Sequence, residues 1–396
     1  MTKNSLKNGP DELGYYGEGE SAMGGMAVGE TLMPALHELN LAFEDAIKDK
    51  AFLDEFAYYC KHYIGRPSPL YHAENLSNKL GGAKILFKQE HLNHTGSHKI
   101  TNSLFQVLLA KRMGKKNLIC ESGAGQHYSA TAAVAAKFGI PLIGVMGEVD
   151  IKRVNQNIIK AKHYGAKLKA VPGTLKEAIT DAIKTWITNP DYYYVCGSAV
   201  SSFPFPKIVQ FAQSIIGREI REQSMEQEKK LPNMIIGCVG GGSNFIGSIH
   251  EFLDEPNIKK IGVEAAETAA LTHGTPNIMQ GMKSYMLASS DGSKSLGGSS
   301  LGAGIQYFGV GPQHSYLKDQ GAVTYTSATD KEILNAYKVV AQTEGISSAL
   351  EPMAAAAEVL KQAKGKPKDF IIVLSLCGRG EKDLDTIEEH MGKDFE

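Results

Sequence analysis

Short apolar runs recur along the chain and alternate with longer stretches of helical character. The apolar runs predict strands at residues 84–88, 117–120, 141–146, 168–171, 192–196, 234–239, 260–264 and 370–376. The stretches between them predict helices at residues 98–113, 129–138, 155–164, 175–188, 206–227, 330–344 and 350–363. Strands that alternate with helices favour an α/β fold with largely parallel sheets. Residues 281–309 break this rhythm, and their Ser and Gly content predicts a long loop.

Composition narrows the classes of protein to which the chain can belong. Its 396 residues, 42% of them hydrophobic, suffice for two or three domain-sized units. The net charge of −1 provides no basic field for a nucleic acid or an anionic membrane. No apolar run approaches the roughly 20 residues of a membrane span, and the N-terminal segment lacks the apolar core of a signal peptide. We therefore expect a cytoplasmic protein. The five cysteines form no C-x-x-C pair and no zinc-ligand spacing, which favours structural cysteines.

A glycine-rich turn follows the predicted strand at 234–239. The sequence GGGSN, residues 240–244, leads from that strand into the helix-like stretch FIGSIHEF. Backbone N–H groups at such a turn, with no Cβ in the way, form a cradle for an anion, and Ser243 and Asn244 add side-chain donors. The turn predicts a phosphate site, with an ordinary tight strand-to-helix turn as the alternative.

The phosphate is not predicted to belong to a dinucleotide. The fingerprint G-x-G-x-x-G requires a third glycine. In the G-x-G sequences that begin at Gly123, Gly240 and Gly378, that third position is Tyr128, Phe245 and Asp383. The Walker A pattern is also absent from the sequence. These failures argue against a nicotinamide enzyme and against a P-loop NTPase.

Lys99 opens a predicted helix whose apolar face includes Ile100, Leu104 and Leu108. Most lysines are solvated surface residues, and a lysine in the first turn of a helix has the wrong sign for the helix dipole. The placement is explained if the amine is covalently bonded to a carbonyl compound that has a phosphate nearby. Lysines of that kind are desolvated and react as neutral amines.

A series of motifs occurs in the order and spacing of one known family. The motifs are RPSPLY, HTGSHKI, ESGAGQH, FPFPKIV, CVGGGSN, IGVEAAE, GVGPQHSYLKDQG, TEGISSALE and GRGEKD. Together, from about Gly14 to Asp383, they strongly resemble the tryptophan synthase β subunits, a family of fold-type II pyridoxal-phosphate enzymes. The resemblance implies two parallel-sheet α/β domains with the cofactor in the cleft between them. It places residues 1–64 and 98–216 in an N-terminal domain, with a mobile communication segment at about 114–200, and residues 65–97 and 217–396 in a C-terminal domain.

The same resemblance implies roles for individual residues. Lys99 would bond to the aldehyde of pyridoxal 5′-phosphate, and Glu121 would be the general acid and base. The cofactor-binding residues would be His98, Lys99, Gln126, Gly240, Gly241, Gly242, Ser243, Asn244, Glu351 and Cys377. The substrate-binding residues would be Ser122, Gly123, Ala124, Gly125, Gln126, His127, Arg153 and Gln306. The backbone carbonyls of Gly240, Tyr307 and Gly309 would bind a monovalent cation, Na⁺ or K⁺.

The residue types fit this chemistry. The cofactor is the electron sink, and the protein orients it. Glu121 could protonate a leaving β-hydroxyl and then take a proton from the incoming nucleophile. Cys377 falls where the family places a serine against the pyridine nitrogen, and an uncharged thiol there favours elimination and replacement over transamination. An ordinary buried cysteine is the alternative for Cys377.

The chain departs from the family pattern at several positions. Gln306 replaces an aspartate that pairs with the arginine now at Arg153, so closure of the site should be weaker or differently triggered. Tyr128 replaces a glycine after the carboxylate loop, where a phenol would fill space near the substrate or change the backbone. Residues 170–175 are about three residues shorter than usual, in the region that couples to an α subunit.

The favoured hypothesis is replacement of the L-serine hydroxyl by indole, which gives L-tryptophan and water. The alternatives are a related pyridoxal-phosphate enzyme with another amino acid or nucleophile, and a weakly active regulatory homologue. The resemblance further implies a homodimer, with a tryptophan synthase α subunit as a possible partner.

Overall fold

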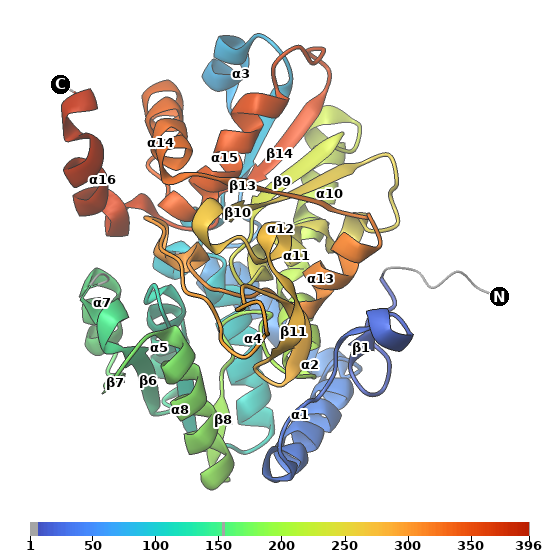
Figure 1. Ribbon diagram of the computed structural model, residues 1–396, viewed down its shortest axis with the longest axis vertical. Helices are drawn as coiled ribbons and strands as arrows, with labels where there is room; N and C mark the ends of the chain where they lie inside the picture. The colour runs from blue at the N-terminus through green and yellow to red at the C-terminus, as the bar shows by residue number, and fades with distance from the viewer. Residues whose placement is uncertain (1–6, 153–154, 396) are drawn as a thin grey trace. The chain divides into compact units, whose positions relative to one another are not determined.

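The computed structural model describes residues 7–152 and 155–395. Contacts within the chain divide it into two compact units. The larger unit contains residues 1–27, 68–92 and 198–396, and the smaller unit contains residues 28–67 and 93–197. Each unit is built on its own parallel sheet (Figure 1).

The larger unit has a six-stranded sheet in the order β13-β10-β9-β14-β4-β3. Only β3 runs antiparallel to its neighbour. The strands are β3 (Leu70–His72), β4 (Lys84–Lys88), β9 (Met234–Cys238), β10 (Lys259–Ala265), β13 (Thr324–Ala328) and β14 (Ile371–Ser375). Four of the predicted apolar runs form the centre of this sheet, as expected for strands covered on both faces.

Helices cover both faces of this sheet. Ile236 and Leu374 belong to the core that includes α15, whereas Ile235 and Val373 belong to the core that includes α10 and α11. Figure 1 shows α14 and α15 packed together on the first face. The helices of this unit are α3 (Glu74–Leu80), α9 (Phe205–Gln213), α10 (Ile215–Glu228), α11 (Ser243–Ile249), α12 (Ala270–His273), α13 (Pro312–Asp319), α14 (Asp330–Glu344), α15 (Leu350–Gln362) and α16 (Leu384–Met391). The predicted helix at 206–227 is therefore two helices, which meet at Ser214.

A second, antiparallel sheet corrects the prediction for residues 281–309. Its order is β1-β2-β12-β11, with β1 (Tyr15–Tyr16), β2 (Met23–Gly24), β11 (Thr275–Met279) and β12 (Met282–Met286). The predicted loop thus begins with a strand. The prediction was wrong there because β12 is stabilised by its pairing with β11 and β2 rather than by an apolar run.

The smaller unit has a four-stranded parallel sheet in the order β7-β6-β5-β8. Its strands are β5 (Asn117–Glu121), β6 (Leu142–Gly147), β7 (Lys167–Val171) and β8 (Tyr192–Tyr194). Its helices are α1 (Met33–Ala46), α2 (Lys50–Tyr59), α4 (Lys99–Arg112), α5 (Gln126–Phe138), α6 (Glu148–Ile151), α7 (Asn155–His163) and α8 (Leu175–Thr188). The α/β prediction with parallel sheets is confirmed in both units.

Two helices that the sequence analysis did not predict support α4. Phe43 of α1, together with Phe52 and Phe56 of α2, packs edge-on against Phe105 of α4 at ring distances of 5.2–6.0 Å. Edge-to-face aromatic pairs of this kind stabilise a core beyond their buried area. They therefore hold the helix that begins at Lys99.

The observed division differs from the predicted domain boundaries at four places. Residues 65–67 and 93–97 belong to the smaller unit rather than to the C-terminal domain. Residues 1–27 and 198–216 belong to the larger unit rather than to the N-terminal one. The physical reason is local: Phe203 N–H donates to the Gly25 carbonyl, β2 pairs with β12, and α9 packs on α11.

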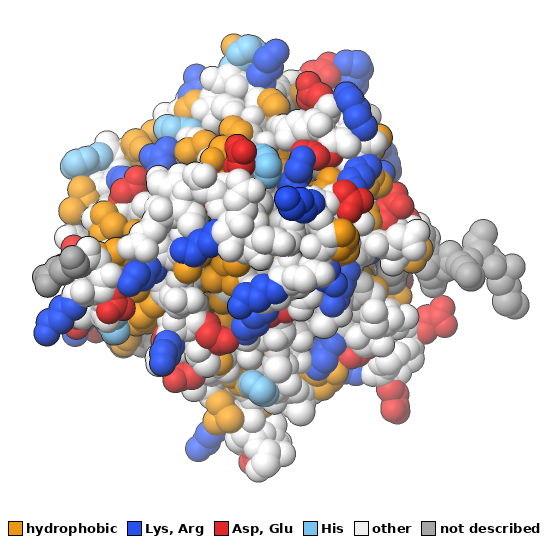
Figure 2. Space-filling view, turned by 90° about the horizontal axis from the view of Figure 1, so that it is seen from above, with side chains coloured by type: hydrophobic (Ala, Val, Ile, Leu, Met, Phe, Trp, Pro, Cys, Tyr) orange, Lys and Arg blue, Asp and Glu red, His pale blue; other side chains and the backbone are white. Residues whose placement is uncertain are grey.

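The described helices include none that is long and apolar enough to cross a bilayer. The face drawn in Figure 2 carries basic and acidic side chains interspersed, with apolar side chains between them.

Candidate active site

Lys99 begins α4, Glu121 ends β5, and both side chains bond to Gly197. Lys99 Nζ donates to the Gly197 carbonyl oxygen, and the Gly197 N–H donates to Glu121 Oε1 at 2.9 Å. A Cβ at position 197 would lie 2.7 Å from the His127 ring and 2.9 Å from Glu121 Oε1. Only glycine therefore fits at this point, which brings together two residues that the sequence predicted and one that it did not.

Glu121 is a buried carboxyl that can exchange a proton near neutral pH. Its side chain is 6% exposed, and burial raises its pKa to about 6. Hydrogen bonds from Tyr194 and Gly197, and the charge of Lys99, limit that rise in pKa. Oε2 has no hydrogen-bond partner among the described residues. A carboxyl group with a pKa close to the working pH is suited to general acid and base catalysis.

The predicted carboxylate loop, residues 122–127, lies at the start of α5. Gly125 precedes that helix with φ +73°, which glycine adopts without strain. The Ser122 N–H donates to the Val145 carbonyl, so it is already used within the sheet. Asn157 of α7 donates to the Ala124 carbonyl at 2.9 Å and orients the loop. The loop and the positive end of the helix can bind a carboxylate through backbone N–H groups.

His127 is neutral and contributes to the site through its position rather than through charge. Burial, together with the charge of the nearby Lys99 ammonium, lowers its pKa to about 3. Its Nε2 bonds the Val195 carbonyl at 2.8 Å, and its Nδ1 lies 3.4 Å from the Thr131 hydroxyl. Because both ring nitrogens are engaged, the ring is not a cationic carboxylate ligand.

Tyr128 is accounted for by packing within the smaller unit. It is fully buried, and a Cβ at Gly144 of β6 would lie 2.2 Å from its ring. Its hydroxyl has no hydrogen-bond partner in the described chain. The ring thus fills space over the sheet at Gly144, whereas the sequence predicted that it fills space near the substrate or changes the backbone of the loop.

The glycine turn in the larger unit is braced by α13. Gly242 has φ +95°, and a Cβ there would lie 2.2 Å from the His314 ring. His314 Nε2 bonds the Gly242 carbonyl and Nδ1 bonds the Tyr325 hydroxyl, each at 2.8 Å. The Gly311 N–H donates to the Gly241 carbonyl at 3.1 Å. The turn is therefore held in shape before any ligand binds.

Glu351, at the start of α15, belongs to a buried charge network. Its Oε1 accepts from the Gly304 N–H at 2.7 Å and from Lys382 at 2.9 Å, and Lys382 also bonds Asp383 at 2.7 Å. Burial acts to raise the pKa of Glu351, but the Lys382 ammonium outweighs it and holds that pKa below its usual value. Glu351 is therefore ionised, and its Oε2 has no hydrogen-bond partner among the described residues.

Cys377 lies just beyond β14 and faces a second cysteine. Its Sγ is 3.5 Å from the Sγ of Cys238, the last residue of β9. Both side chains are buried and neither is in a disulfide.

Three further predicted residues, Gln306, Tyr307 and Gly309, lie in the segment before α13. Gln306 donates from Nε2 to the Gly298 carbonyl at 3.1 Å, and Gly309 forms a bridge with Met286 of β12. Tyr307 accepts from Gln280 at 3.3 Å. Arg153 lies outside the described residues, so its pairing with position 306 stays a prediction. The described chain holds no cluster of three His, Cys, Asp or Glu side chains fit for a metal.

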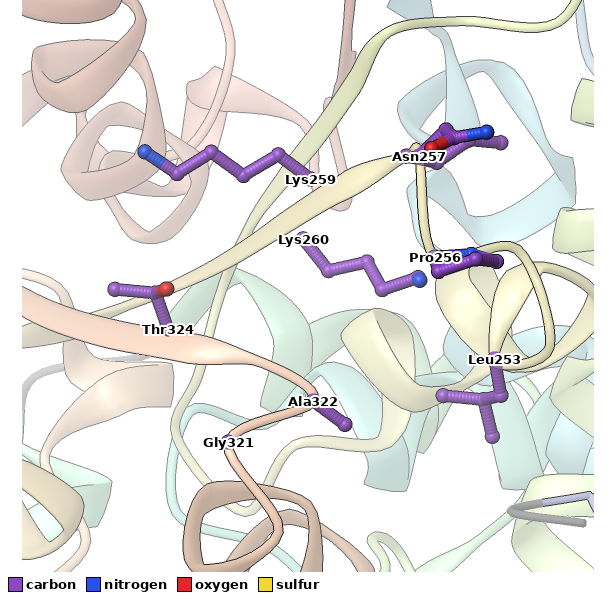
Figure 3. Close-up of a pocket in the computed structure, with 9 residues that line it drawn as sticks. Leu253, Pro256, Asn257, Lys259, Lys260, Gly321, Ala322 and Thr324 are labelled. Carbon is purple, nitrogen blue, oxygen red and sulfur yellow. The ribbon is translucent and has the colours of Figure 1, made fainter.

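A hollow elsewhere in the larger unit contains none of the predicted site residues. It has a volume of about 430 Å³ and is lined by residues at the start of β10 and β13, including Lys259, Lys260 and Thr324 (Figure 3). Ligands of open α/β sheets bind at the opposite, carboxyl edge of the strands. Cys238, Cys377 and the glycine turn lie at that carboxyl edge.

Comparison with known proteins decides the family. The profile of the family described as pyridoxal-phosphate dependent enzyme matches residues 62–378. The chain belongs to this family. It is also 48% identical over 401 residues to a protein named tryptophan synthase beta chain from Allorhizobium ampelinum, with 98% of each chain covered. Membership makes the protein an enzyme with pyridoxal phosphate as its cofactor, as predicted.

The residues of this family member fit the cofactor. The side chain of Asn244 is 4% exposed, yet neither its amide nitrogen nor its amide oxygen has a partner in the described chain. Buried polar groups are normally hydrogen-bonded. An unpartnered amide beside a preformed glycine turn is explained by a phosphate that accepts from it.

Sequence reasoning missed Gly197, Tyr194 and Asn157 in the smaller unit, and His314 at the glycine turn of the larger unit. Gly197 is 76 residues from its partner Glu121, and His314 is 72 residues from Gly242. Local patterns carry no signal for such pairs. Gly197 directly follows the predicted strand at 192–196, but that position alone does not indicate its partners.

Proposed function

We propose that this enzyme replaces the β-hydroxyl of L-serine with indole, which gives L-tryptophan and water. The 48% identity to a tryptophan synthase beta chain over nearly the whole length supports this reaction. The observation that carries the proposal is the joint anchoring of Lys99 and Glu121 at Gly197. It places an amine and a carboxyl that can exchange protons beside one backbone residue.

The cofactor, when bound, supplies an electron sink that lets bonds at the Cα and Cβ of an amino acid break. We assign its covalent attachment to Lys99. Its phosphate is assigned to His98 and to the turn Gly240–Asn244, where Asn244 offers an unpartnered amide. Glu351 and Cys377 are assigned to the pyridine ring. Cys377 is uncharged as a thiol and therefore does not hold a proton on the ring nitrogen.

Glu121 performs the proton transfers to and from the reacting groups. In its protonated form it gives a proton to the departing serine hydroxyl, which leaves as water. As a carboxylate it then takes the proton released by indole. The raised pKa of about 6 makes both forms accessible. Burial of the carboxyl excludes the water that would compete for these protons.

The loop at the start of α5 orients the amino acid. The N–H groups of residues 123–126 are assigned to the substrate carboxylate, since that of Ser122 is used by Val145. Because His127 is neutral, attraction comes from backbone dipoles rather than from an imidazolium. Gln306 and Arg153 are assigned to closure around the substrate, and the carbonyls of Gly240, Tyr307 and Gly309 to a monovalent cation. The protein is further proposed to be cytoplasmic and homodimeric, with an α subunit as partner.

The proposal is tested with purified protein, pyridoxal phosphate, L-serine and indole. We expect tryptophan to accumulate. Reduction with borohydride should fix the cofactor on the protein, and peptide mass spectrometry should locate it on Lys99. The matched control is Lys111→Ala, which removes an exposed lysine of the same helix. It should keep the label and the activity, whereas Lys99→Ala should lose both.

Other outcomes of these experiments would support a different function. Turnover of another amino acid, with no tryptophan from serine and indole, would replace the proposal with a related β-elimination or β-replacement enzyme. A labelled protein that reacts with no amino acid would identify a regulatory homologue. Activity that does not change when an α subunit is added would argue against that partner.

A further inference from the structure

Two cysteine side chains meet at the carboxyl edge of the larger sheet. The sulfur atoms of Cys238 and Cys377 are 3.5 Å apart. β9 and β14 are parallel neighbours, paired from Met234 with Ile372 to Ile236 with Leu374. Cys238 ends β9 and Cys377 follows the end of β14, so the two residues lie at the ends of adjacent strands.

This placement brings the two thiols within reach of each other. Neighbouring strands lie about 4.8 Å apart, and disulfides join Cα atoms separated by about 4.4–6.8 Å. The two sulfurs are 3.5 Å apart, so an S–S bond of about 2.05 Å requires them to approach by about 1.5 Å. Isolated buried cysteines lack such a partner and are chemically inert.

We propose that Cys238 and Cys377 form a reversible disulfide when the enzyme meets a peroxide. One thiol attacks hydrogen peroxide, which gives a sulfenic acid and one water. The second thiol attacks that sulfur, which forms the S–S bond and releases the second water. Two thiols and one peroxide thus give one disulfide and two waters, and two electrons pass from sulfur to oxygen. A dithiol reductant reverses the bond by exchange.

The disulfide would act on the cofactor site. This part rests on the proposed placement of Cys377 at the pyridine ring. Once Cys377 is bonded to Cys238 it has no S–H to donate to the ring nitrogen, and its sulfur is drawn toward β9. The side chains are only 5% and 7% exposed, so a small oxidant reaches them more readily than a bulky one. Oxidation should therefore change the environment of bound cofactor without unfolding the protein.

The test uses the holoenzyme treated with hydrogen peroxide, then denatured, alkylated and digested. We expect two of the five thiols to escape alkylation, together with a linked peptide pair that contains Cys238 and Cys377 and lacks two hydrogen atoms. The absorbance of bound cofactor should shift with the same time course and return after dithiothreitol. The linked peptides are read without any turnover, so failure of the proposed reaction would not mimic failure of this proposal.

Variants make the test specific. Cys377→Ser and Cys238→Ser should each abolish the linked pair and the absorbance shift, whereas Cys60→Ser, a buried cysteine of the smaller unit, should keep both. Sulfinic or sulfonic acid at Cys377 with an intact thiol at Cys238 would overturn the disulfide. Linked peptides with an unchanged cofactor spectrum would overturn its effect on the site.

Discussion

Lys99 and Glu121 are joined through one residue, because Gly197 accepts a hydrogen bond from the Lys99 amine and donates one to the Glu121 carboxylate. The three residues come from the start of α4, the end of β5 and the segment after β8. The relative position of the amine and the carboxyl therefore depends on a single backbone residue. This arrangement makes specific predictions.

Glu121→Gln should keep the cofactor and lose turnover. The amide matches the carboxyl in shape but cannot exchange a proton, so kcat should fall by about 10²–10⁴-fold. Cofactor absorbance and steady-state kinetics check this. The matched control is Glu358→Gln, a buried glutamate of α15 that bonds Gln362 and should retain activity. If Glu121→Gln turned over as fast as the parent enzyme, Glu121 would have no catalytic role.

The acid limb of kcat/KM should have its midpoint near pH 6. Burial raises the Glu121 pKa from 4.5 to about 6, so the base form is lost as the pH falls through 6. For stability the sign is opposite to that of a salt-bridged carboxylate. The folded state binds this proton more tightly than the unfolded state does, so the free energy of unfolding should fall as pH rises from 4.5 to about 6. Glu121→Gln should reduce that slope in denaturant titrations, because buried Glu264, whose pKa is also raised, still contributes. An acid limb of kcat/KM centred at pH 4.5 would contradict the prediction.

Gly197→Ala should damage catalysis more than folding. The added methyl would lie 2.7 Å from the His127 ring and 2.9 Å from Glu121 Oε1, so these groups must move. A displacement of about 1 Å in an active site can reduce the rate about 100-fold, and we expect a loss of that size in kcat. Gly29→Ala is the control, because a methyl there meets nothing within 4 Å. Equal kinetics for the two variants would show that Gly197 does not position the carboxyl.

Tyr128→Phe should be neutral or stabilising. The hydroxyl is buried without a hydrogen-bond partner, so its removal should leave the free energy of unfolding unchanged or raise it by about 1 kcal/mol. Tyr128→Ala should instead leave a cavity over Gly144 and lower that free energy by about 3–5 kcal/mol. Urea unfolding distinguishes the two. A large loss of serine turnover in Tyr128→Phe would instead show that the phenol acts near the substrate.

Gln306→Asp should strengthen the reaction with serine. An aspartate loses the donor to the Gly298 carbonyl but can form the charge-assisted pair that the family resemblance assigns to Arg153. We expect kcat/KM for L-serine to rise by about tenfold, equivalent to about 1.4 kcal/mol. Gln306→Asn, which keeps an amide, should show no rise. An unaltered or slower serine reaction in Gln306→Asp would count against the pairing.

The sequence alone determined the elements whose causes are local. The apolar run at 84–88 coincides with β4, and the helix at 330–344 coincides with α14. Thr329 and Glu332 form a capping box there, and Gly345 ends the helix with φ +65°, so the signals lie within a few residues of the element. The glycine turn and the motif around Lys99 could also be predicted from the sequence, because a phosphate cradle and a helix start are local structures.

Only the tertiary structure decided which distant residues meet. β12 was predicted as loop because its stability comes from β11 and β2 rather than from its own pattern. Gly197 was not predicted because its role depends on three side chains that approach from other elements. The same holds for Cys238 and Cys377, which are 139 residues apart in the chain but meet because two parallel strands end side by side. Periodicity reports which face of an element is buried, but only the packed sheet determines what lies against that face.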